Sequence, residues 1–494
     1  MANPPKAIII GSGVAGLACA IRLAVQGFEV TIYEKNNYPG GKLTHFEQDG
    51  YSFDAGPSLF TEPANIEALF ALANEPIEPY FQYQTLPISC KYFYEDGTVI
   101  NAYANNALFA QELATQLGEN ATTVQRYLQE ANELYQHVAN IFLHYSLHEF
   151  QTLLQAPIAK AIATVKPKHL FKTMHGLNEQ CFTHPHTIQL FNRYATYNGS
   201  NPYQAPGMLS LIAHLEHNIG SFYPKGGMIS ITNALFRLAK KKGVCFKFNQ
   251  KVDSIVHHNG HVQGVLLNNE LQEAAIVVSN MDVYYTYQHL LGNPIMAKKI
   301  LQQERSSSAL IFYWGINSVF PQLELHNIFF SDHYKAEFDC LFKSKTLHPD
   351  PTVYVNITAK CEPGIQAPNG KENWFVMINA PANSGQDWQS LQQQAKQAII
   401  TKLNRILSIK LEDLIETESV LDPVTIDQKT ASYMGSLYGT SSNSANAAFL
   451  RHPNFSKNIK GLYFAGGSVH PGGGIPLCLK SAEIVANMVQ KQFS

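Results

Sequence analysis

The feature that most constrains the fold is a short apolar run that leads directly into a glycine-rich turn. Residues 7–10 suit a buried parallel strand, and the sequence Gly11-Ser12-Gly13-Val14-Ala15-Gly16 follows at once. A helix-like segment over 14–25 comes next, and a second strand over 28–33 ends on Glu34. This order of strand, glycines, helix, strand and acid predicts a dinucleotide-binding unit built on a parallel sheet.

The residues of this unit have distinct physical roles. Gly11 permits the tight turn, Gly13 lets the backbone approach a pyrophosphate, and Gly16 allows the helix to pack closely on the strand. Unpaired N–H groups at the helix N-terminus favour the anion, and the Glu34 carboxylate can accept hydrogen bonds from the adenosine ribose. Ser12 and Ala15 belong to the same turn. The ordered set indicates nucleotide binding, where glycines alone would fit an ordinary turn.

Two further turns extend this anion-friendly surface. Gly40 and Gly41 beside Lys42 favour binding of an anion, and the Gly56-Pro57 turn can bring its backbone against a flat ring. A solvated loop lysine is the alternative for Lys42, and these turns do not by themselves distinguish NAD from FAD. The candidate cofactor residues of this region are Lys35, Gly41, Lys42, Leu43, Gly56, Pro57 and Ser58.

Later segments complete the expected site. A helical segment is expected after residue 228, followed by strands near 246–248, 252–257, 261–267 and 274–278, and Val252 can touch adenine through its backbone. Near the end of the sequence a strand enters a glycine-dense turn and a helix that runs to about residue 489. That helix N-terminus can meet a phosphate or a flavin carbonyl, although the turn could simply be flexible. Its candidate residues are Gly466, Gly467, Ile475 and Pro476, whereas His470 fits packing better than catalysis.

Length and composition set further bounds. A chain of 494 residues exceeds what one core organises, so we expect two or three domains. A net charge of −2 argues against nucleic acid, which requires a basic surface. No metal-ligand pattern, leader segment or run of 18 apolar residues is visible, so we expect a cytoplasmic protein or one at the inner membrane face.

Several motifs carry a resemblance to a known family. They are Gly40-Gly41-Lys42, Asp54-x-Gly56-Pro57, Tyr223-Pro-x-Gly-Gly-Met228 and Ser468-x-His-Pro-Gly-x-Gly-Ile-Pro476. Together with the glycine fingerprint they resemble the carotenoid desaturase and isomerase branch of the FAD-dependent amine oxidase superfamily, and bacterial phytoene-type desaturases in particular. The stretch 197–206 is similar to the 3,4-desaturases of hydroxylated carotenoids.

The resemblance implies an α/β fold with a discontinuous Rossmann-type domain that binds FAD non-covalently, over 1–75, 215–285 and 430–494. An inserted α+β substrate domain is expected over 76–214 and 286–429. Only one nucleotide fingerprint is visible, so the reduced flavin is expected to pass its electrons to oxygen or a quinone. Candidates for lining a long apolar substrate slot are Tyr194, Tyr197, Tyr203 and Phe222, with ordinary core packing as the alternative.

Residues 150–178 contain no acid yet carry Lys160, Lys166, Lys168 and Lys172 among apolar residues. This composition fits a pair of interfacial helices, broken at Pro167, that attaches the protein peripherally to anionic lipid. The alternative is a surface helix packed on the substrate domain.

The expected reaction is dehydrogenation of a C–C bond of a polyene. The favoured substrate is a 1-hydroxylated carotenoid of the hydroxy-γ-carotene or hydroxyneurosporene type, oxidised at its 3,4 bond. A phytoene desaturase, a carotenoid isomerase or a polyene saturase are the alternatives, and a non-catalytic carotenoid carrier is a fourth. A polyene can spread developing positive charge, so the chemistry needs no strong acid or base, and no catalytic residue is assigned.

Overall fold

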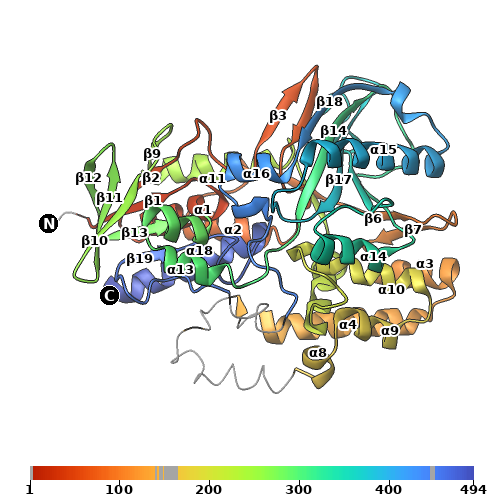
Figure 1. Ribbon diagram of the computed structural model, residues 1–494, viewed down its shortest axis with the longest axis horizontal. Helices are drawn as coiled ribbons and strands as arrows, with labels where there is room; N and C mark the ends of the chain where they lie inside the picture. The colour runs from red at the N-terminus through yellow and green to blue at the C-terminus, as the bar shows by residue number, and fades with distance from the viewer. Residues whose placement is uncertain (1–3, 140–141, 144–147, 149–164, 445–450, 494) are drawn as a thin grey trace.

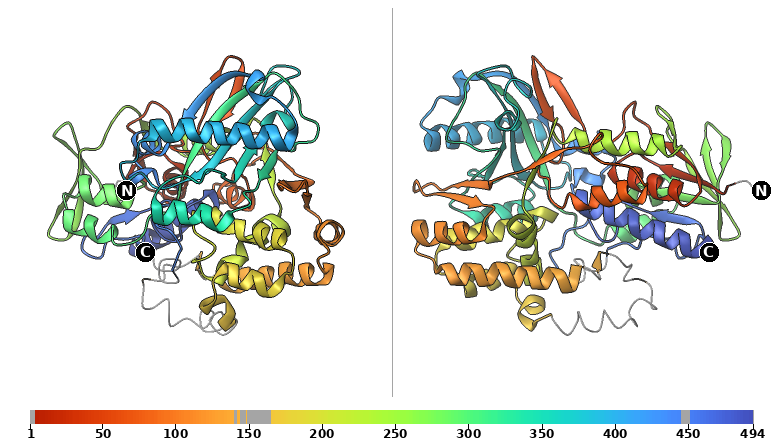
Figure 2. Two further views of the ribbon diagram at one scale, coloured as in Figure 1. Left: turned by 45° about the vertical axis from the view of Figure 1, so that its right-hand side comes forward. Right: turned by 180° about the vertical axis from the view of Figure 1, so that it is seen from behind.

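The computed structural model describes residues 4–139, 142–143, 148, 165–444 and 451–493. Two sheets lie toward opposite ends of the long axis (Figure 1), and views from two further directions keep them apart (Figure 2). Among the described residues, no helix is both long enough and apolar enough to cross a membrane.

The first sheet has five parallel strands in the order β19-β13-β1-β2-β9. Its strands are β1 (Lys6–Ile10), β2 (Glu29–Tyr33), β9 (Cys245–Lys247), β13 (Ile276–Ser279) and β19 (Leu462–Phe464). Every strand lies within the three segments predicted for the cofactor domain. A parallel sheet must be covered on both faces, which accounts for the uninterrupted isoleucines of β1.

Three helices cover one face of this sheet, namely α1 (Val14–Val25), α11 (Ile229–Lys241) and α18 (Ile475–Phe493). On the other face pack the antiparallel strands β10 (Ser254–His258), β11 (His261–Leu267) and β12 (Glu270–Glu273), with α12 (Val283–Tyr285) and α13 (Pro294–Ile300) nearby. The helix expected over 14–25 and the strand expected over 261–267 are confirmed at these bounds.

The second sheet has seven strands in the order β18-β14-β17-β16-β15-β6-β7, antiparallel except for the β15–β6 pair. All of them lie within the predicted substrate segments: β6 (Ile88–Phe93), β7 (Val99–Tyr103), β14 (Ser308–Ile316), β15 (His326–Phe329), β16 (Val353–Asn356), β17 (Glu372–Ala380) and β18 (Ile415–Leu421). The long helix α15 (Trp388–Leu407) packs its apolar side on one face of this sheet.

A layer of helices lies below the second sheet in Figure 1. Asn105, Asn120 and Thr173 cap three of these helices by accepting hydrogen bonds from backbone N–H groups of the first turn, which marks where each helix begins. The layer comprises α3 (Asn106–Leu117), α4 (Ala121–Leu134), α8 (Pro167–Phe171), α9 (Met174–Cys181), α10 (Pro185–Asn192) and α14 (Tyr334–Asp339), with the short helix η3 (Gly207–Ile212).

Shorter elements connect the two parts. They are the hairpin β3 (His45–Gln48) and β4 (Tyr51–Asp54), the pair β5 (Tyr83–Thr85) and β8 (Phe222–Pro224), α2 (Ala64–Leu72) and α16 (Pro423–Thr430). Met228 N–H donates to Asp54 Oδ1 at 2.9 Å, so β4 and the start of α11 are held together.

Candidate functional site

One cavity of about 2000 Å³ runs between the two sheets. Ligand pockets usually enclose about 300–1000 Å³, so this cavity has room for a dinucleotide and a second long molecule. Sixteen of the eighteen residues predicted to bind the cofactor line it. They are Gly11, Gly13, Ala15, Glu34, Lys35, Gly41, Lys42, Leu43, Gly56, Pro57, Ser58, Val252, Gly466, Gly467, Ile475 and Pro476.

The glycine turn between β1 and α1 leaves no room for side chains. Gly11 has a φ of +94°, which strongly favours glycine. A Cβ atom on Gly13 would lie 2.6 Å from Asn280 Oδ1, and one on Gly16 would lie 2.2 Å from the Gly11 carbonyl oxygen. Backbone is therefore bare where a pyrophosphate would approach the N-terminus of α1. Gly16 itself lies behind the cavity wall, where α1 packs on β1.

Glu34 follows β2 and is only 6% exposed, yet it forms part of the cavity wall. Its Oε1 atom accepts a hydrogen bond from Asn36 N–H at 2.9 Å, and Oε2 is held by Ser12. Ser12 is thus not a wall residue but the partner that fixes this carboxylate. A fixed acceptor at the end of the second strand fits a ribose hydroxyl.

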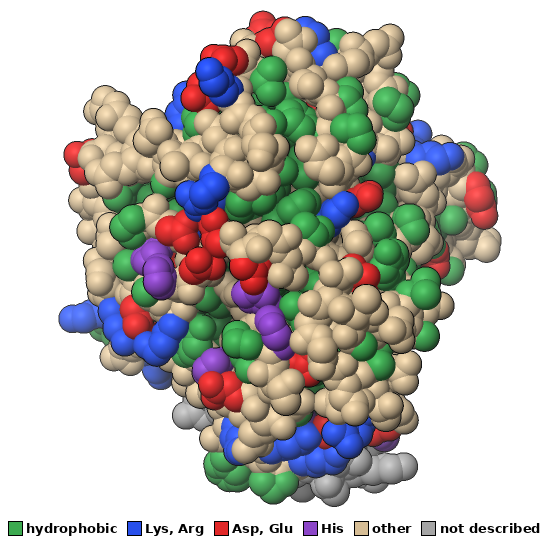
Figure 3. Space-filling view, turned by 90° about the vertical axis from the view of Figure 1, so that its right-hand side faces the viewer, with side chains coloured by type: hydrophobic (Ala, Val, Ile, Leu, Met, Phe, Trp, Pro, Cys, Tyr) green, Lys and Arg blue, Asp and Glu red, His purple; other side chains and the backbone are tan. Residues whose placement is uncertain are grey.

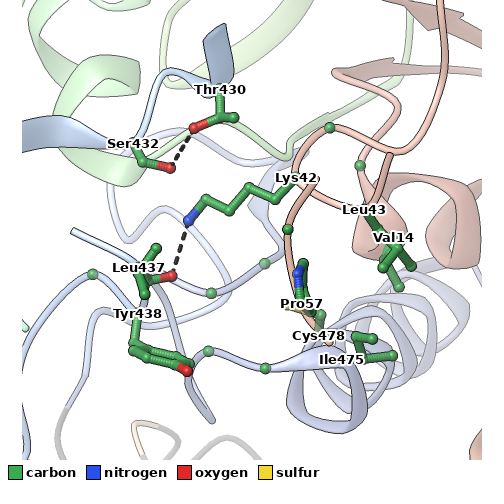
Figure 4. Close-up of a pocket in the computed structure, with 18 of the residues that line it drawn as sticks. Val14, Lys42, Leu43, Pro57, Thr430, Ser432, Leu437, Tyr438, Ile475 and Cys478 are labelled. Carbon is green, nitrogen blue, oxygen red and sulfur yellow. Dashed lines mark hydrogen bonds between the residues drawn. The ribbon is translucent and has the colours of Figure 1, made fainter. Parts of the chain in front are cut away.

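Lys42 reaches across the cavity toward the chain that precedes the C-terminal strand (Figure 4). Its Nζ donates to the Leu437 carbonyl oxygen at 2.9 Å, and no carboxylate of the described residues pairs with it. Burial lowers the pKa of Lys42 to about 8, with the charge of Asp282 acting in the opposite direction. A desolvated ammonium group of this kind is stabilised when an anion enters the cavity.

Arg451, which no sequence motif indicated, is 2% exposed and also lines the cavity. Its Nη1 donates to the Tyr438 carbonyl oxygen at 2.7 Å, and within the described chain it has carbonyl and hydroxyl partners but no carboxylate. Burial lowers the pKa of Arg451 to about 10. Two cations without acidic partners among the described residues and a bare glycine turn fit the negative charge of a dinucleotide.

Asn280 was also missed, although its position at the end of a strand beside β1 was a usable signal. Its Nδ2 donates to the Ala465 carbonyl oxygen at 2.8 Å, and its Oδ1 faces the glycine turn. It therefore ties the carboxyl ends of three neighbouring strands together at the cavity edge, which is where ligands bind in parallel sheets.

The four aromatic residues predicted to line the substrate slot are separated by the structure. Tyr197 lies on the cavity wall, whereas Tyr194, Tyr203 and Phe222 do not. Phe222 packs against Phe60 in the cofactor-domain core. Tyr203 packs against His175 with ring centroids 4.5 Å apart. For these three residues the alternative of core packing describes the observed positions.

Tyr194 and Tyr197 belong to a buried polar cluster around Arg193 and Glu216. Arg193 Nη2 lies 3.0 Å from Glu216 Oε2, and both tyrosine hydroxyls donate to the same carboxylate. Although burial alone would raise it, the pKa of Glu216 is lowered to about 2 because Arg193 stabilises the charged form. The cluster satisfies its own charges, so we interpret it as structural.

The remaining wall of the cavity is the face of the seven-stranded sheet that points away from α15. Aligned positions on neighbouring strands present apolar side chains, and the registered pairs Ile311–Met377 and Met377–Tyr354 lie side by side on it. From the helical layer, Met208, Leu209 and Ile212 of η3 add to the same surface. This half of the cavity suits a long apolar molecule.

The comparisons with known proteins agree with this geometry. Residues 14–490 match the model of the flavin containing amine oxidoreductases. A 1-hydroxycarotenoid 3,4-desaturase of Flavobacterium sp. (strain P99-3) is 50% identical over 98% of this chain and 99% of the relative. A 4,4'-diapolycopene oxygenase of Methylomonas sp. is 33% identical over 98% of each chain.

Solved structures show the same fold at low identity. Cyclohexylamine oxidase from Brevibacterium oxydans IH-35A superposes with a TM-score of 0.62 at 16% identity, covering 99% of each chain. An oxidoreductase from Methanosarcina mazei superposes with a TM-score of 0.62 at 14% identity, covering 98% of this chain and all of the other.

The chain belongs to the flavin-containing amine oxidoreductase family, and it is an oxidoreductase whose cofactor is FAD. The resemblance to carotenoid desaturases seen in its motifs is confirmed by its full-length relatives. The predicted α/β fold with a Rossmann-type sheet is confirmed as well.

Proposed function

We propose that this protein is a FAD-dependent desaturase that oxidises the 3,4 bond of a 1-hydroxylated carotenoid. The observation that carries the proposal is the 50% identity, over nearly the whole of both chains, to a relative that bears that name. The size of the cavity and its apolar sheet wall support it, because a polyene needs a long dry slot beside the cofactor.

The residues of the cofactor end would hold FAD by complementary charge and shape. We assign the ribose to Glu34, the pyrophosphate to the glycine turn, and further negative charge of the cofactor to Lys42 and Arg451. When bound, FAD would supply the two-electron acceptor that the dehydrogenation of a C–C bond requires. The apolar wall contributes by aligning the C–C bond and by keeping water from it.

We further propose that the protein draws its substrate from a lipid surface at α8. In this helix Phe171 is 86% exposed and Leu170 is 41% exposed. The helix packs on η3, whose Met208, Leu209 and Ile212 line the cavity. Basic and hydrophobic side chains lie together at the lower edge of Figure 3, the end of the molecule where Figure 1 places α8.

Two of the lysines on this surface already have an acidic partner. Lys166 and Lys168 both pair with Glu130, at 2.5 and 2.7 Å, so the apolar residues are expected to contribute more than electrostatic attraction does. Residues 150–164 of the predicted interfacial segment, with Lys160, lie outside the described residues. The proposal therefore rests on the described part, 165–172.

Liposome sedimentation tests the lipid contact. Phe171→Glu should lower binding to anionic vesicles at least tenfold, because it places a charge where an apolar ring is buried in lipid. Ile365→Glu is the matched control, since Ile365 is also exposed, at 70%, but lies beside β4, where Gln366 accepts from Ser52 N–H. Equal binding of both variants would refute the lipid contact.

The test of the reaction is anaerobic mixing of FAD-loaded protein with lipid-dispersed carotenoids. A 1-hydroxylated carotenoid should bleach the flavin and give a red-shifted product lighter by two hydrogens, and phytoene should not. Turnover of phytoene would indicate an earlier desaturation, and a product of unchanged mass or a shortened chromophore would indicate an isomerase or a saturase. We expect oxygen or a quinone to restore the flavin absorbance, whereas reoxidation by neither would contradict that part of the proposal.

A further inference from the structure

The apolar sheet wall contains one polar group that the reaction as described so far does not use. His326 begins β15, is 3% exposed and lines the cavity. Its Nδ1 lies 2.8 Å from the hydroxyl of Tyr354 on the neighbouring strand β16. The Tyr354 hydroxyl in turn lies 2.9 Å from Ser58 Oγ, so the group is joined to the Gly56-Pro57 turn of the cofactor end.

The hydrogen bonds of His326 determine which ring nitrogen carries the proton. Asn356 Nδ2 lies 3.1 Å from Nδ1 and also donates to the Leu325 carbonyl oxygen at 3.2 Å, so its amide nitrogen faces the ring. An amide N–H is only a donor, and Nδ1 must therefore be an acceptor. Burial lowers the pKa of His326 to about 4, so the ring is neutral and its proton is on Nε2.

This Nε2–H group is buried and has no hydrogen-bond partner within the described chain. A buried donor without a partner is unfavourable, and an incoming oxygen atom would relieve that cost. The same protonation state excludes a role as the acceptor of the substrate proton, because the ring nitrogen that has no partner already carries one. His326 is thus equipped to bind an oxygen atom.

A second unpartnered group lies on the adjoining strand. Ser89 is 1% exposed, lines the cavity, and has no partner for its Oγ among the described residues. It lies in β6, which pairs with β15 on one side and with β7 on the other, and the pairing with β7 shifts register between Ile88 and Cys90. Such a bulge can turn an additional side chain toward a site. Two unpartnered polar groups therefore belong to paired strands of the same cavity wall.

The location also fits the substrate class. The single hydroxyl of a 1-hydroxylated carotenoid is on C1, two bonds from C3, so it must lie near the cofactor when the 3,4 bond reacts. A Cβ atom on Gly56 would lie 1.8 Å from the Lys42 carbonyl oxygen. The turn that carries Ser58 is therefore in close backbone contact with Lys42. The alcohol site is thereby connected to the cofactor end of the cavity.

We propose that His326 and Ser89 determine specificity by binding the tertiary hydroxyl of the substrate. His326 Nε2–H donates a hydrogen bond to its oxygen, and Ser89 Oγ accepts a hydrogen bond from its O–H group. Tyr354 and Asn356 act as positioning residues that hold the imidazole in the donor state. This inference rests on the proposed function, because a substrate without the hydroxyl would not use the site.

The test compares a 1-hydroxylated carotenoid with the same polyene lacking the hydroxyl, on FAD-loaded protein. Two quantities are measured for each compound: kcat/KM, and the equilibrium dissociation constant of the corresponding desaturated product, followed by its absorption shift. His326→Phe and Ser89→Ala should each lower the preference for the hydroxylated compound tenfold to a hundredfold in both quantities. His326→Gln, which keeps an N–H donor, should restore part of it.

His214→Phe is the matched control, because His214 is likewise buried, at 4% exposure, and its pKa is lowered to about 4, but it does not line the cavity. It should leave the preference unchanged. The preference is a ratio, so a loss of folded protein does not alter it, and Ser89→Ala removes only one oxygen atom.

The outcomes separate the two proposals. If wild-type protein does not distinguish the two compounds, the proposed function is wrong, and the proposed alcohol site is refuted as well. If wild-type protein prefers the hydroxylated compound and both His326→Phe and Ser89→Ala keep that preference, the desaturase proposal stands and the alcohol site is refuted.

Discussion

The carboxylate of Glu34 accepts two hydrogen bonds from Ser12, one from its backbone N–H at 2.8 Å and one from its hydroxyl at 2.9 Å. The second residue of the glycine turn therefore orients the acid that ends the second strand. Ser12 and Glu34 are 22 residues apart in the sequence, but they form one hydrogen-bonded unit in the structure.

We expect Glu34→Gln to weaken FAD binding tenfold to a hundredfold. The amide has one acceptor oxygen in place of two, so it cannot serve Ser12, Asn36 and a ribose hydroxyl together, and each lost bond is worth about 1–2 kcal/mol. Titration of FAD-free protein with FAD measures the dissociation constant. Glu29→Gln, at an exposed position of β2, should bind FAD as the wild type does. Equal affinity of the two variants would contradict the role of Glu34.

Lys42 should make FAD binding depend on pH. Its pKa is lowered to about 8 by burial, and the negative cofactor favours the protonated form, so FAD binding takes up a proton when the pH is above about 8. The dissociation constant should therefore rise as the pH increases from 8 to 10. Lys42→Met should bind FAD more weakly and show a flatter pH dependence, whereas Lys247→Met, at an exposed position of β9, should behave as wild type. If the dissociation constant of Lys42→Met for FAD still rose steeply with pH, another group would be responsible for the pH dependence.

The Arg193–Glu216 pair should contribute strongly to stability. Replacing Arg193 by Met leaves the 1% exposed carboxylate of Glu216 without its counter-ion, and we expect a loss of about 3–5 kcal/mol in the free energy of unfolding. Urea unfolding measures it. Combining this change with Glu216→Gln should cost less than the sum of the single changes, because no lone charge remains. Lys335→Met breaks an exposed pair with Asp339 and should cost at most about 1 kcal/mol.

Tyr203 and Phe222 should affect stability without affecting substrate choice. Neither lines the cavity, so Tyr203→Ala and Phe222→Ala should lower the free energy of unfolding by roughly 1–3 kcal/mol. The ratio of kcat/KM for hydroxylated and unhydroxylated carotenoid should remain at the wild-type value in both. A changed ratio would indicate that these residues contact the substrate, as the prediction from the sequence had it.

The cofactor end of the cavity could be predicted from the sequence because its chemistry is local. The turn from Gly11 to Gly16 and the acid at Glu34 lie within one strand–helix–strand unit, whose spacing follows from the geometry of the parallel sheet. Arg451 could not be found in this way. It belongs to no strand or helix, and only the folded chain brings its guanidinium to Tyr438 and Gly467.

The substrate end was harder to predict for the same reason. The short helix η2 (Arg193–Asn198) carries both Tyr194 and Tyr197. Its sequence does not reveal that the buried carboxylate of Glu216, 22 residues from Tyr194, accepts hydrogen bonds from both hydroxyls. Likewise His326 begins a strand of four residues with no motif around it, and its exposure to the cavity follows from the order of strands in the sheet.

The parallel sheet has a consequence for how the protein is made. Its central strand β1 leaves the ribosome well before the edge strand β19, which follows every other strand of both sheets in the sequence. Contacts of such long sequence separation form slowly, and until β19 is in place one edge of β13 lacks its strand neighbour. FAD binds only the assembled sheet and shifts the folding equilibrium toward it, so supply of the vitamin precursor of FAD should set how much of this protein a cell accumulates.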